Sequence, residues 1–227
     1  YSGKFALHRD GADIHHHIGI SAFAEFSVMS RNSVVKVDST LPLVEVAMFG
    51  CAVITGVGSV VNRAKVEKGS TVAVYGCGGV GLNVIQGARL MNASRIIAVD
   101  VHDHKLEFTY KFGATDVVNS REVDPVEAIK EMTGGGVDYA FDAIGVRQTN
   151  EQILPATRGG GSGADNHGGM AVLIGIPGPE MTLAPRMFTL HQRQYRGSLG
   201  ATYPEKDFAT FLRWHREGKF PLDKLIT

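Results

Sequence analysis

A chain of 227 residues with 44% hydrophobic and 20% charged residues can form one large domain, or one domain and part of another, around a sizeable core. Lysine plus arginine and aspartate plus glutamate both total 23, so no excess of basic charge is available for nucleic acid or an anionic membrane. The 2 cysteines are too few for a disulfide framework, and no apolar run approaches the roughly 20 residues of a membrane helix. We therefore expect a cytoplasmic protein whose partners are small molecules or copies of itself.

The first fifty residues predict β-structure that gives way to helix. Apolar and polar residues alternate over 22–28 and 34–37, as they do on a strand buried on one face. Over 43–57 the apolar residues fall instead near helical spacing, and 59–63 can add a second helical turn before a turn at 66–69. We expect strands near the N-terminus and helical structure after them.

A glycine-rich segment follows. An apolar run ends in Gly76, Gly78 and Gly81, and the stretch after these glycines suits a helix. In this order the first glycine allows a tight turn, the second leaves the backbone open to a pyrophosphate, and the third lets the helix pack close to the strand. Asp100 follows Gly81 by nineteen residues, at the end of a second apolar run, where a carboxylate can accept hydrogen bonds from both ribose hydroxyls. This pattern predicts a dinucleotide site on a βαβ unit, with an ordinary glycine turn in an α/β fold as the alternative.

Strands and helices alternate beyond the glycines. After the two apolar runs, strands are predicted at 116–118, 137–142, 170–175 and 195–198, and helices at 104–112, 125–132 and 147–157. This order is typical of an α/β fold with a doubly wound, six-stranded parallel sheet, the Rossmann arrangement, beside part of a mainly β domain. Residues 158–169 hold six glycines and predict a mobile insertion, and one amphipathic helix is predicted from Pro204 to near Gly218.

Histidine and cysteine are the residue types that zinc prefers. His15, His16 and His17 are consecutive, and neighbouring residues of an extended chain point to opposite faces, so the three cannot bind one ion without distortion. Cys51 is one candidate ligand, although a free cysteine is more often a small buried hydrophobe. Cys77 lies between two glycines of the segment above, where its backbone matters more than its thiol, so we expect a structural role.

Several segments together resemble one known family. They are 14–26, 49–56, 66–74, the glycine segment, 93–100, 112–115, 135–139 and 222–227. In this order they resemble the zinc-dependent medium-chain alcohol dehydrogenases, in the branch that contains the liver-type and glutathione-dependent formaldehyde dehydrogenases. An alcohol can be activated by a metal, by a Tyr-Lys pair or by a His-acid pair, and no Tyr-x-x-x-Lys motif occurs in the chain. The resemblance runs nearly from end to end.

The resemblance implies a role for each matching residue. It makes Cys51 the third protein ligand of a catalytic Zn2+, the reverse of what residue type alone suggests. It implies an NAD site, with Thr55 near the nicotinamide, Gly76, Gly78, Gly79, Val80 and Gly81 at the pyrophosphate, Asp100 and Lys105 at the adenosine ribose, Ile144, Gly145, Ile174, Gly175 and Ile176 along the coenzyme, and the backbone of Ser198 and Leu199 at the carboxamide. Asp100 would repel a 2′-phosphate, which favours NAD over NADP. His17 and Ile18 match a loop near the substrate pocket.

Two departures from the family pattern limit what the chain can do alone. The family places its other catalytic zinc ligands, its proton-relay Ser or Thr and its structural zinc lobe upstream of anything in this sequence. It also continues past Thr227 with a segment that supplies a coenzyme-binding Arg. The chain therefore looks truncated at both ends, and no proton-relay residue can be assigned within it.

The resemblance leads to one main functional prediction and two alternatives. The parent protein is expected to oxidise an alcohol to an aldehyde or ketone with NAD and zinc, as a homodimer or homotetramer paired through 195–199. We expect residues 1–52 to form part of the catalytic domain, 53–199 the NAD-binding domain and 200–227 a return to the catalytic domain. The first alternative is a coenzyme-binding fragment without zinc or activity. The second is a zinc-independent quinone reductase relative, which would lack Cys51 and its context.

Overall fold

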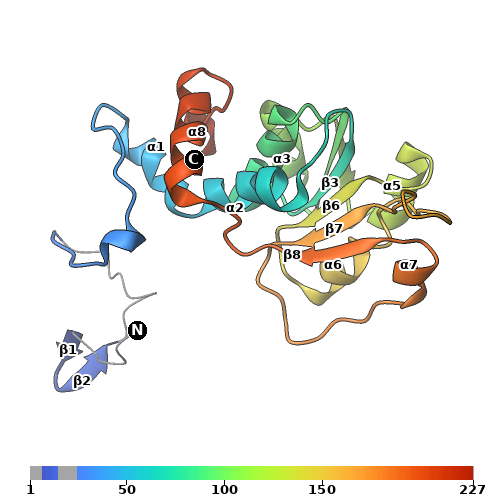
Figure 1. Ribbon diagram of the computed structural model, residues 1–227, viewed down its shortest axis with the longest axis horizontal. Helices are drawn as coiled ribbons and strands as arrows, with labels where there is room; N and C mark the ends of the chain where they lie inside the picture. Colours follow the sequence, from blue (N-terminus) through green and yellow to red (C-terminus); the bar gives the residue numbers. More distant parts are fainter. Residues whose placement is uncertain (1–6, 15–24, 227) are drawn as a thin grey trace. The chain divides into compact units, whose positions relative to one another are not determined.

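The computed structural model describes residues 7–14 and 25–226 (Figure 1). The chain divides into two units, 1–39 and 40–227. In the first unit, strands β1 (Leu7–Arg9) and β2 (Ala12–Ile14) form an antiparallel hairpin. Asp10 and Gly11 connect them with φ angles of 52° and 80°, the turn that two-residue hairpins favour. The hairpin is absent from the predicted elements, although Asp-Gly is a strong hairpin signal in a sequence.

The prediction of a strand at 34–37 is wrong. These residues form no strand, and the only regular structure between 25 and 39 is a 3-10 turn, Arg31–Ser33, which the side chain of Ser30 caps. A strand is stable only when its N–H and C=O groups pair with a neighbour, and no described strand lies beside 34–37. In the other predicted run, 25–28 is not a strand either, and 22–24 lies outside the described residues.

The second unit contains the predicted six-stranded parallel sheet, with strand order β5-β4-β3-β6-β7-β8. Its strands are β3 (Thr71–Tyr75), β4 (Arg95–Asp100), β5 (Asp116–Asn119), β6 (Tyr139–Asp142), β7 (Met170–Leu173) and β8 (Gln194–Gly197). The chain first winds from β3 to β5 and then returns to the other side of β3 with β6. This order is that of a doubly wound sheet, whose ligand crevice lies where the direction reverses.

Helices cover both faces of the sheet (Figure 1). They are α1 (Leu43–Ala47), α2 (Ala52–Gly58), α3 (Gly79–Leu90), α4 (Asp103–Thr109), α5 (Pro125–Thr133), α6 (Arg147–Gln152), α7 (Arg186–Thr189) and α8 (Pro204–Arg216). Val72 and Val74 of β3 pack in one core with α3 and α4, and the alternate residues Ala73 and Tyr75 pack in another with α5. Because successive strand residues point to opposite faces, an unbroken apolar strand is buried on both.

Three helices differ from the sequence prediction in their limits. The helical pattern over 43–57 is broken at Cys51, whose φ of −145° and ψ of −77° separate α2 from the turn that follows α1. Helix α3 begins at Gly79, within the glycine segment itself, and ends at Leu90. Helix α6 ends at Gln152, well short of 157, because Pro155 lacks an N–H and disfavours helical backbone in the residue before it.

A π-helical turn, Ser59–Ala64, continues α2, and Lys65 directly after it has a φ of 55°. Among the described residues no single helix is long and apolar enough to cross a membrane; the bent pair 43–50 and 52–64 meets the length and composition criteria together. Val53, Val57 and Val60 in this pair are fully buried in the protein core.

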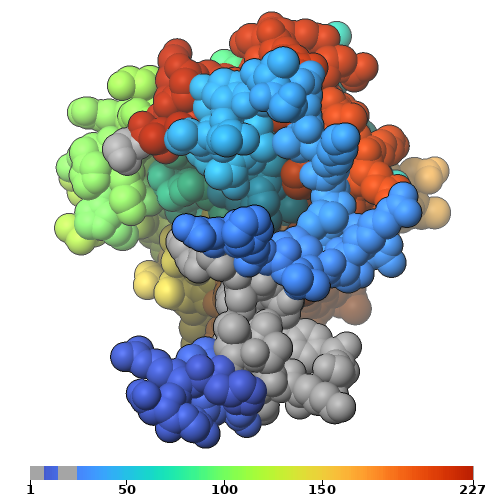
Figure 2. Space-filling model, turned by 90° about the vertical axis from the view of Figure 1, so that its left-hand side faces the viewer, coloured from blue at the N-terminus to red at the C-terminus, as the bar shows by residue number. Residues whose placement is uncertain are grey.

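Helices α1 and α8 pack side by side in the second unit (Figures 1 and 2). The rings of Phe49, just after α1, and Phe208 of α8 have centroids 5.9 Å apart. His215 Nε2 of α8 lies 2.6 Å from Glu45 Oε2 of α1. The helix predicted from Pro204 onward is confirmed. Through these contacts it packs against the segment that precedes Cys51.

The glycine-rich loop 158–169 is hydrogen-bonded to the segment that precedes β8. Gly160 N donates to His191 O at 2.7 Å and Gly168 N to Gln192 O at 3.0 Å, while the Gln192 amide donates to Gly161 O. The loop thus forms backbone contacts with its neighbour in space, and the mobility expected for it stays a prediction.

Candidate functional site

The glycine segment has the three local geometries that its sequence predicts. Gly76, directly after β3, has a φ of 93°, which an L side chain rarely adopts. A Cβ at Gly81 would overlap the carbonyl oxygen of Gly76, so only glycine allows this approach of α3 to the strand end. A Cβ at Gly78 would meet nothing within 4 Å. The first turn of α3, with Gly79 and Val80, therefore begins beside open space, and the free N–H groups of such a turn favour an anion.

Asp100 ends β4 next to this segment. Its side chain is buried with 7% exposure, and its Oδ2 atom accepts a hydrogen bond from Cys77 N at 2.9 Å. Its Oδ1 atom accepts from Val101 N at 2.8 Å and from His102 N at 3.1 Å. The carboxylate is thus fixed by three backbone donors, one from the glycine segment and two from the residues that follow β4.

Cys77 is buried, as the sequence predicts, with 4% exposure. Its Sγ atom donates to Val99 O at 3.7 Å. Burial, together with the nearby Asp100 charge, raises the pKa of the Cys77 thiol to about 12, and the half-buried Lys105 of α4 acts in the opposite direction. The thiol is therefore protonated at neutral pH and is neither a nucleophile nor a metal ligand there.

The residues after β6 and β7 extend the site from the glycine segment. A Cβ at Gly76 would lie 2.5 Å from Ile144 Cγ1, which puts Ile144 directly against the glycine turn. A Cβ at Gly145, which has a φ of 92°, would overlap Ile176 O, and one at Gly175 would overlap Gly145 N. Five predicted coenzyme-lining residues, Ile144, Gly145, Ile174, Gly175 and Ile176, therefore form adjoining turns.

Asp142, which is not among the residues predicted from the sequence, holds these turns in place. It is fully buried at the end of β6 and accepts hydrogen bonds from Ile144 N at 2.8 Å, Gly145 N at 3.2 Å and the Asn150 amide. Burial raises the pKa of the Asp142 carboxyl, and these hydrogen bonds act in the opposite direction. An acid at the end of an apolar strand and before a glycine turn is the signal that could have identified it.

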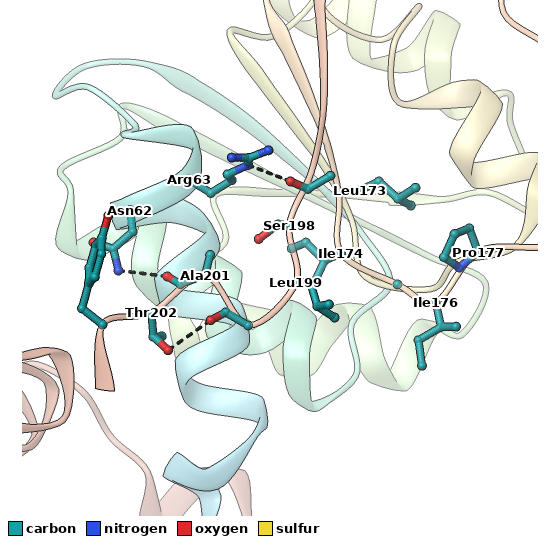
Figure 3. Close-up of a pocket in the computed structure, with 14 residues that line it drawn as sticks. Asn62, Arg63, Leu173, Ile174, Ile176, Pro177, Ser198, Leu199, Ala201 and Thr202 are labelled. Carbon is teal, nitrogen blue, oxygen red and sulfur yellow. Dashed lines mark hydrogen bonds between the residues drawn. The ribbon is translucent and has the colours of Figure 1, made fainter. Parts of the chain in front are cut away.

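A cavity of about 700 Å³ lies beyond the ends of β7 and β8 (Figure 3). Residues 173–177 form one wall and residues 197–203 the other, with Asn62 and Arg63 from the π-helical turn beside them. The cavity brings together Ile174, Gly175, Ile176, Ser198 and Leu199 of the predicted set. Ile176 and Leu199 are 91% and 98% exposed, so two large apolar side chains stand free beside it.

Thr55 is connected to this cavity through two serines. Ser59 Oγ lies 2.6 Å from Thr55 O and 2.8 Å from Ser198 Oγ. A hydroxyl has one hydrogen, so if Ser59 donates it to the carbonyl, Ser198 donates to Ser59. The hydroxyl of Ser198 is therefore directed toward the π-helical turn.

The described residues do not make up a zinc site. Cys51 is exposed at the start of α2, and no group of three or more His, Cys, Asp or Glu residues that could hold a metal exists in 7–14 and 25–226. His15, His16, His17 and Ile18 lie outside the described residues. One thiolate does not form a protein zinc site, which takes three or four ligands.

A family model described as zinc-binding dehydrogenase matches residues 79–217, more than half of the chain. The chain belongs to this family. It is 37% identical over 224 residues to S-(hydroxymethyl)glutathione dehydrogenase of Saccharomyces cerevisiae, which covers 96% of the chain and 56% of the yeast protein. The predicted family resemblance is thereby confirmed.

Two solved structures of dehydrogenases share the fold. Benzyl alcohol dehydrogenase from Acinetobacter calcoaceticus is 33% identical, with a TM-score of 0.83 over 91% of this chain and 56% of that chain. A putative zinc-binding dehydrogenase from Sinorhizobium meliloti, bound to NADP, is 26% identical, with a TM-score of 0.72 over 83% of this chain and 53% of that chain. The chain thus spans about half the length of the relatives it matches, and the α/β fold with a six-stranded parallel sheet agrees with theirs.

Proposed function

We propose that this chain supplies the NAD-binding part of an alcohol dehydrogenase, and that the whole protein oxidises an alcohol to an aldehyde or ketone. The carrying observation is the junction of Asp100 with the glycine segment through the Cys77 N to Asp100 Oδ2 hydrogen bond. It joins a carboxylate suited to ribose hydroxyls to an open backbone suited to a pyrophosphate.

The proposed dinucleotide runs along the crevice from β4 to β8. The adenosine ribose lies at Asp100 with Lys105 nearby, and the pyrophosphate lies over Gly78 at the start of α3. The nicotinamide half lies toward the cavity, where Ile176 and Leu199 can cover its ring. Support comes from the steric continuity of Gly76, Ile144, Gly145, Gly175 and Ile176 between the two ends.

When bound, NAD supplies a carbon that accepts hydride. The residues of this chain would bind and orient the dinucleotide, and the apolar side chains of Ile176 and Leu199 would exclude water from one face. Cys51 would provide one zinc ligand in the whole protein, with the others coming from outside the described residues. The alternative proposal, for the chain alone, is a coenzyme-binding fragment without catalytic zinc or activity of its own.

Self-association and domain division belong to the same proposal. Strand β8 is an edge of the sheet, and Phe188 and Leu190 just before it are 38% and 69% exposed. Pairing of two β8 edges about a twofold axis would cover these groups in a homodimer, alone or within a homotetramer. In the proposed division, residues 53–199 form the NAD-binding domain. Residues 1–52 and 200–227 belong to the catalytic domain of the whole protein.

Calorimetric titration of the full chain with NADH and NADPH tests the proposal. We expect NADH to bind, and Asp100→Ser to weaken NADH on the order of tenfold while reducing the preference over NADPH, because a charged acceptor for the ribose is lost. Asp165→Ser makes the same charge change at an exposed position in the loop 158–169 and should leave both affinities unchanged. Unaltered NADH affinity in Asp100→Ser would show that this acid is not on the ribose.

A further inference from the structure

The cavity wall formed by residues 197–203 is held by residues far away in the sequence. Asn62 Nδ2 donates to Ala201 O at 2.9 Å, and the same nitrogen donates to Asp207 Oδ2 at 2.7 Å (Figure 3 shows the first bond). A side-chain amide has two N–H groups, so both are used within the protein. Asn62 lines the cavity but has no donor left for a ligand.

Asp207 fixes the other end of the wall. It lies in the first two turns of α8 with 4% exposure, and its Oδ2 atom also accepts from Tyr203 N at 2.7 Å. A carboxylate that returns to the N–H of the residue before its helix acts as a cap and sets how the chain enters the helix. One oxygen of Asp207 thus joins the end of the wall to the π-helical turn.

The wall also packs tightly on α2. A Cβ at Gly58 would lie 2.5 Å from Ala201 O and 2.9 Å from Thr202 Cγ2. The backbone of α2 therefore touches the wall at the position where Asn62 binds it. Steric contacts with Gly58 and hydrogen bonds to Asn62 and Asp207 therefore fix the position of residues 201–203 together.

We propose that Asn62 and Asp207 are positioning residues for the nicotinamide half of the bound coenzyme. They hold residues 198–203 at the distance from Ile174, Gly175 and Ile176 that the cavity requires, and they do not touch the coenzyme's adenosine half. This inference rests on the proposed function, because it assumes that the cavity receives the nicotinamide. It adds two residues that neither the glycine segment nor Asp100 predicts.

The test compares two ligands on the full chain. NADH reaches both ends of the site, whereas ADP-ribose occupies only the Asp100 and glycine end. We expect Asn62→Ala to weaken NADH on the order of tenfold, since two hydrogen bonds of the wall are lost, and to change ADP-ribose less than about twofold. The fluorescence of bound NADH, which reports the surroundings of the nicotinamide, should shift toward that of free NADH. Asn166→Ala, in the loop 158–169, is the matched control and should change neither ligand.

A second variant covers the case in which Asn62→Ala does not fold. Asp207→Asn keeps the size of the side chain and replaces a charged acceptor with a neutral one, which weakens the hydrogen bonds that it accepts. We expect NADH to bind about threefold more weakly and ADP-ribose to bind as before. Thermal unfolding of each variant identifies any general loss of stability.

The outcomes separate the inference from the proposed function. If the wild-type chain binds neither ligand, the proposed function fails and the inference with it. If the wild type binds both and the variants lose both equally, or lose neither, the positioning role is wrong and the proposed function stands. Selective loss of NADH with altered fluorescence supports the positioning role.

Discussion

The Asp100 end and the cavity end of the site differ in the sequence distance that their contacts span. At the first end, the bond from Cys77 N to Asp100 joins residues 23 positions apart, within one βαβ unit. At the second, Ser59 and Ser198 are 139 positions apart, and Asn62 and Asp207 are 145 apart. The first end is built by a local motif and the second by tertiary packing, so their responses to substitution should differ.

The largest expected effect is at the third glycine of the motif. In Gly81→Ala the new Cβ overlaps the carbonyl oxygen of Gly76, and because both atoms are bonded directly to backbone atoms, neither can move without displacing α3 or β3. We expect the free energy of unfolding to fall by about 3 kcal/mol and NADH binding to be lost. Urea unfolding followed by circular dichroism measures the first quantity. A stability within about 0.5 kcal/mol of wild type would contradict the close approach of helix and strand.

Gly78→Ala is the matched comparison within the same motif. A Cβ there meets no atom within 4 Å, and the φ of −86° suits alanine, so the folded chain should keep its stability. The methyl group would instead occupy the space proposed for the pyrophosphate. We expect NADH and ADP-ribose to bind at least about tenfold more weakly, through lost hydrogen bonds to a charged ligand, in calorimetric titration. Retained affinity for both would mean that the pyrophosphate does not approach Gly78.

The geometry of the glycine segment could be predicted from the sequence because its reasons are local: a positive φ at Gly76 and the close approach of helix and strand at Gly81. Apolar runs between helical segments likewise predicted all six strands of the sheet, since strands buried on both faces are apolar throughout. Residues 34–37 show the limit of this reasoning, because alternation indicates a strand only where a partner strand exists. Asp142, Asn62 and Asp207 were missed for a related reason, because the role of a polar side chain depends on hydrogen-bond partners that only the fold brings near.

The pH dependence of stability tests whether water is excluded from the Cys77 thiol at the Asp100 end of the site. Burial raises its pKa to about 12 in the folded chain, whereas an unfolded thiol titrates near about 8.5. The stability from the buried neutral thiol is fully present below the unfolded pKa, and it is lost as pH rises toward the folded one. Between about pH 9 and 10 the wild type should lose about 1 kcal/mol more than Cys77→Ala does.

Unfolding measured for both chains at each pH cancels the titration of every other group. Thiol labelling near pH 8 adds an independent check, since the exposed Cys51 should react and Cys77 should not until the chain unfolds. Parallel pH curves for the two chains, or rapid labelling of both cysteines, would show that water reaches the glycine segment.

The smallest effect is expected at Ser198, where the comparison is between the affinities for NADH and for ADP-ribose. Ser198→Ala removes the hydroxyl that donates to Ser59, yet Ser59 keeps its bond to Thr55 O, so no buried donor loses its partner. The chain should lose about 0.5 to 1.5 kcal/mol of unfolding free energy, the net value of one hydrogen bond. NADH should bind about twofold more weakly and ADP-ribose unchanged, because Asn62 and Asp207 still hold the wall. If Ser198→Ala instead weakened NADH as much as Asn62→Ala, the wall would depend on the serine pair, and the amide and carboxylate would be secondary to it.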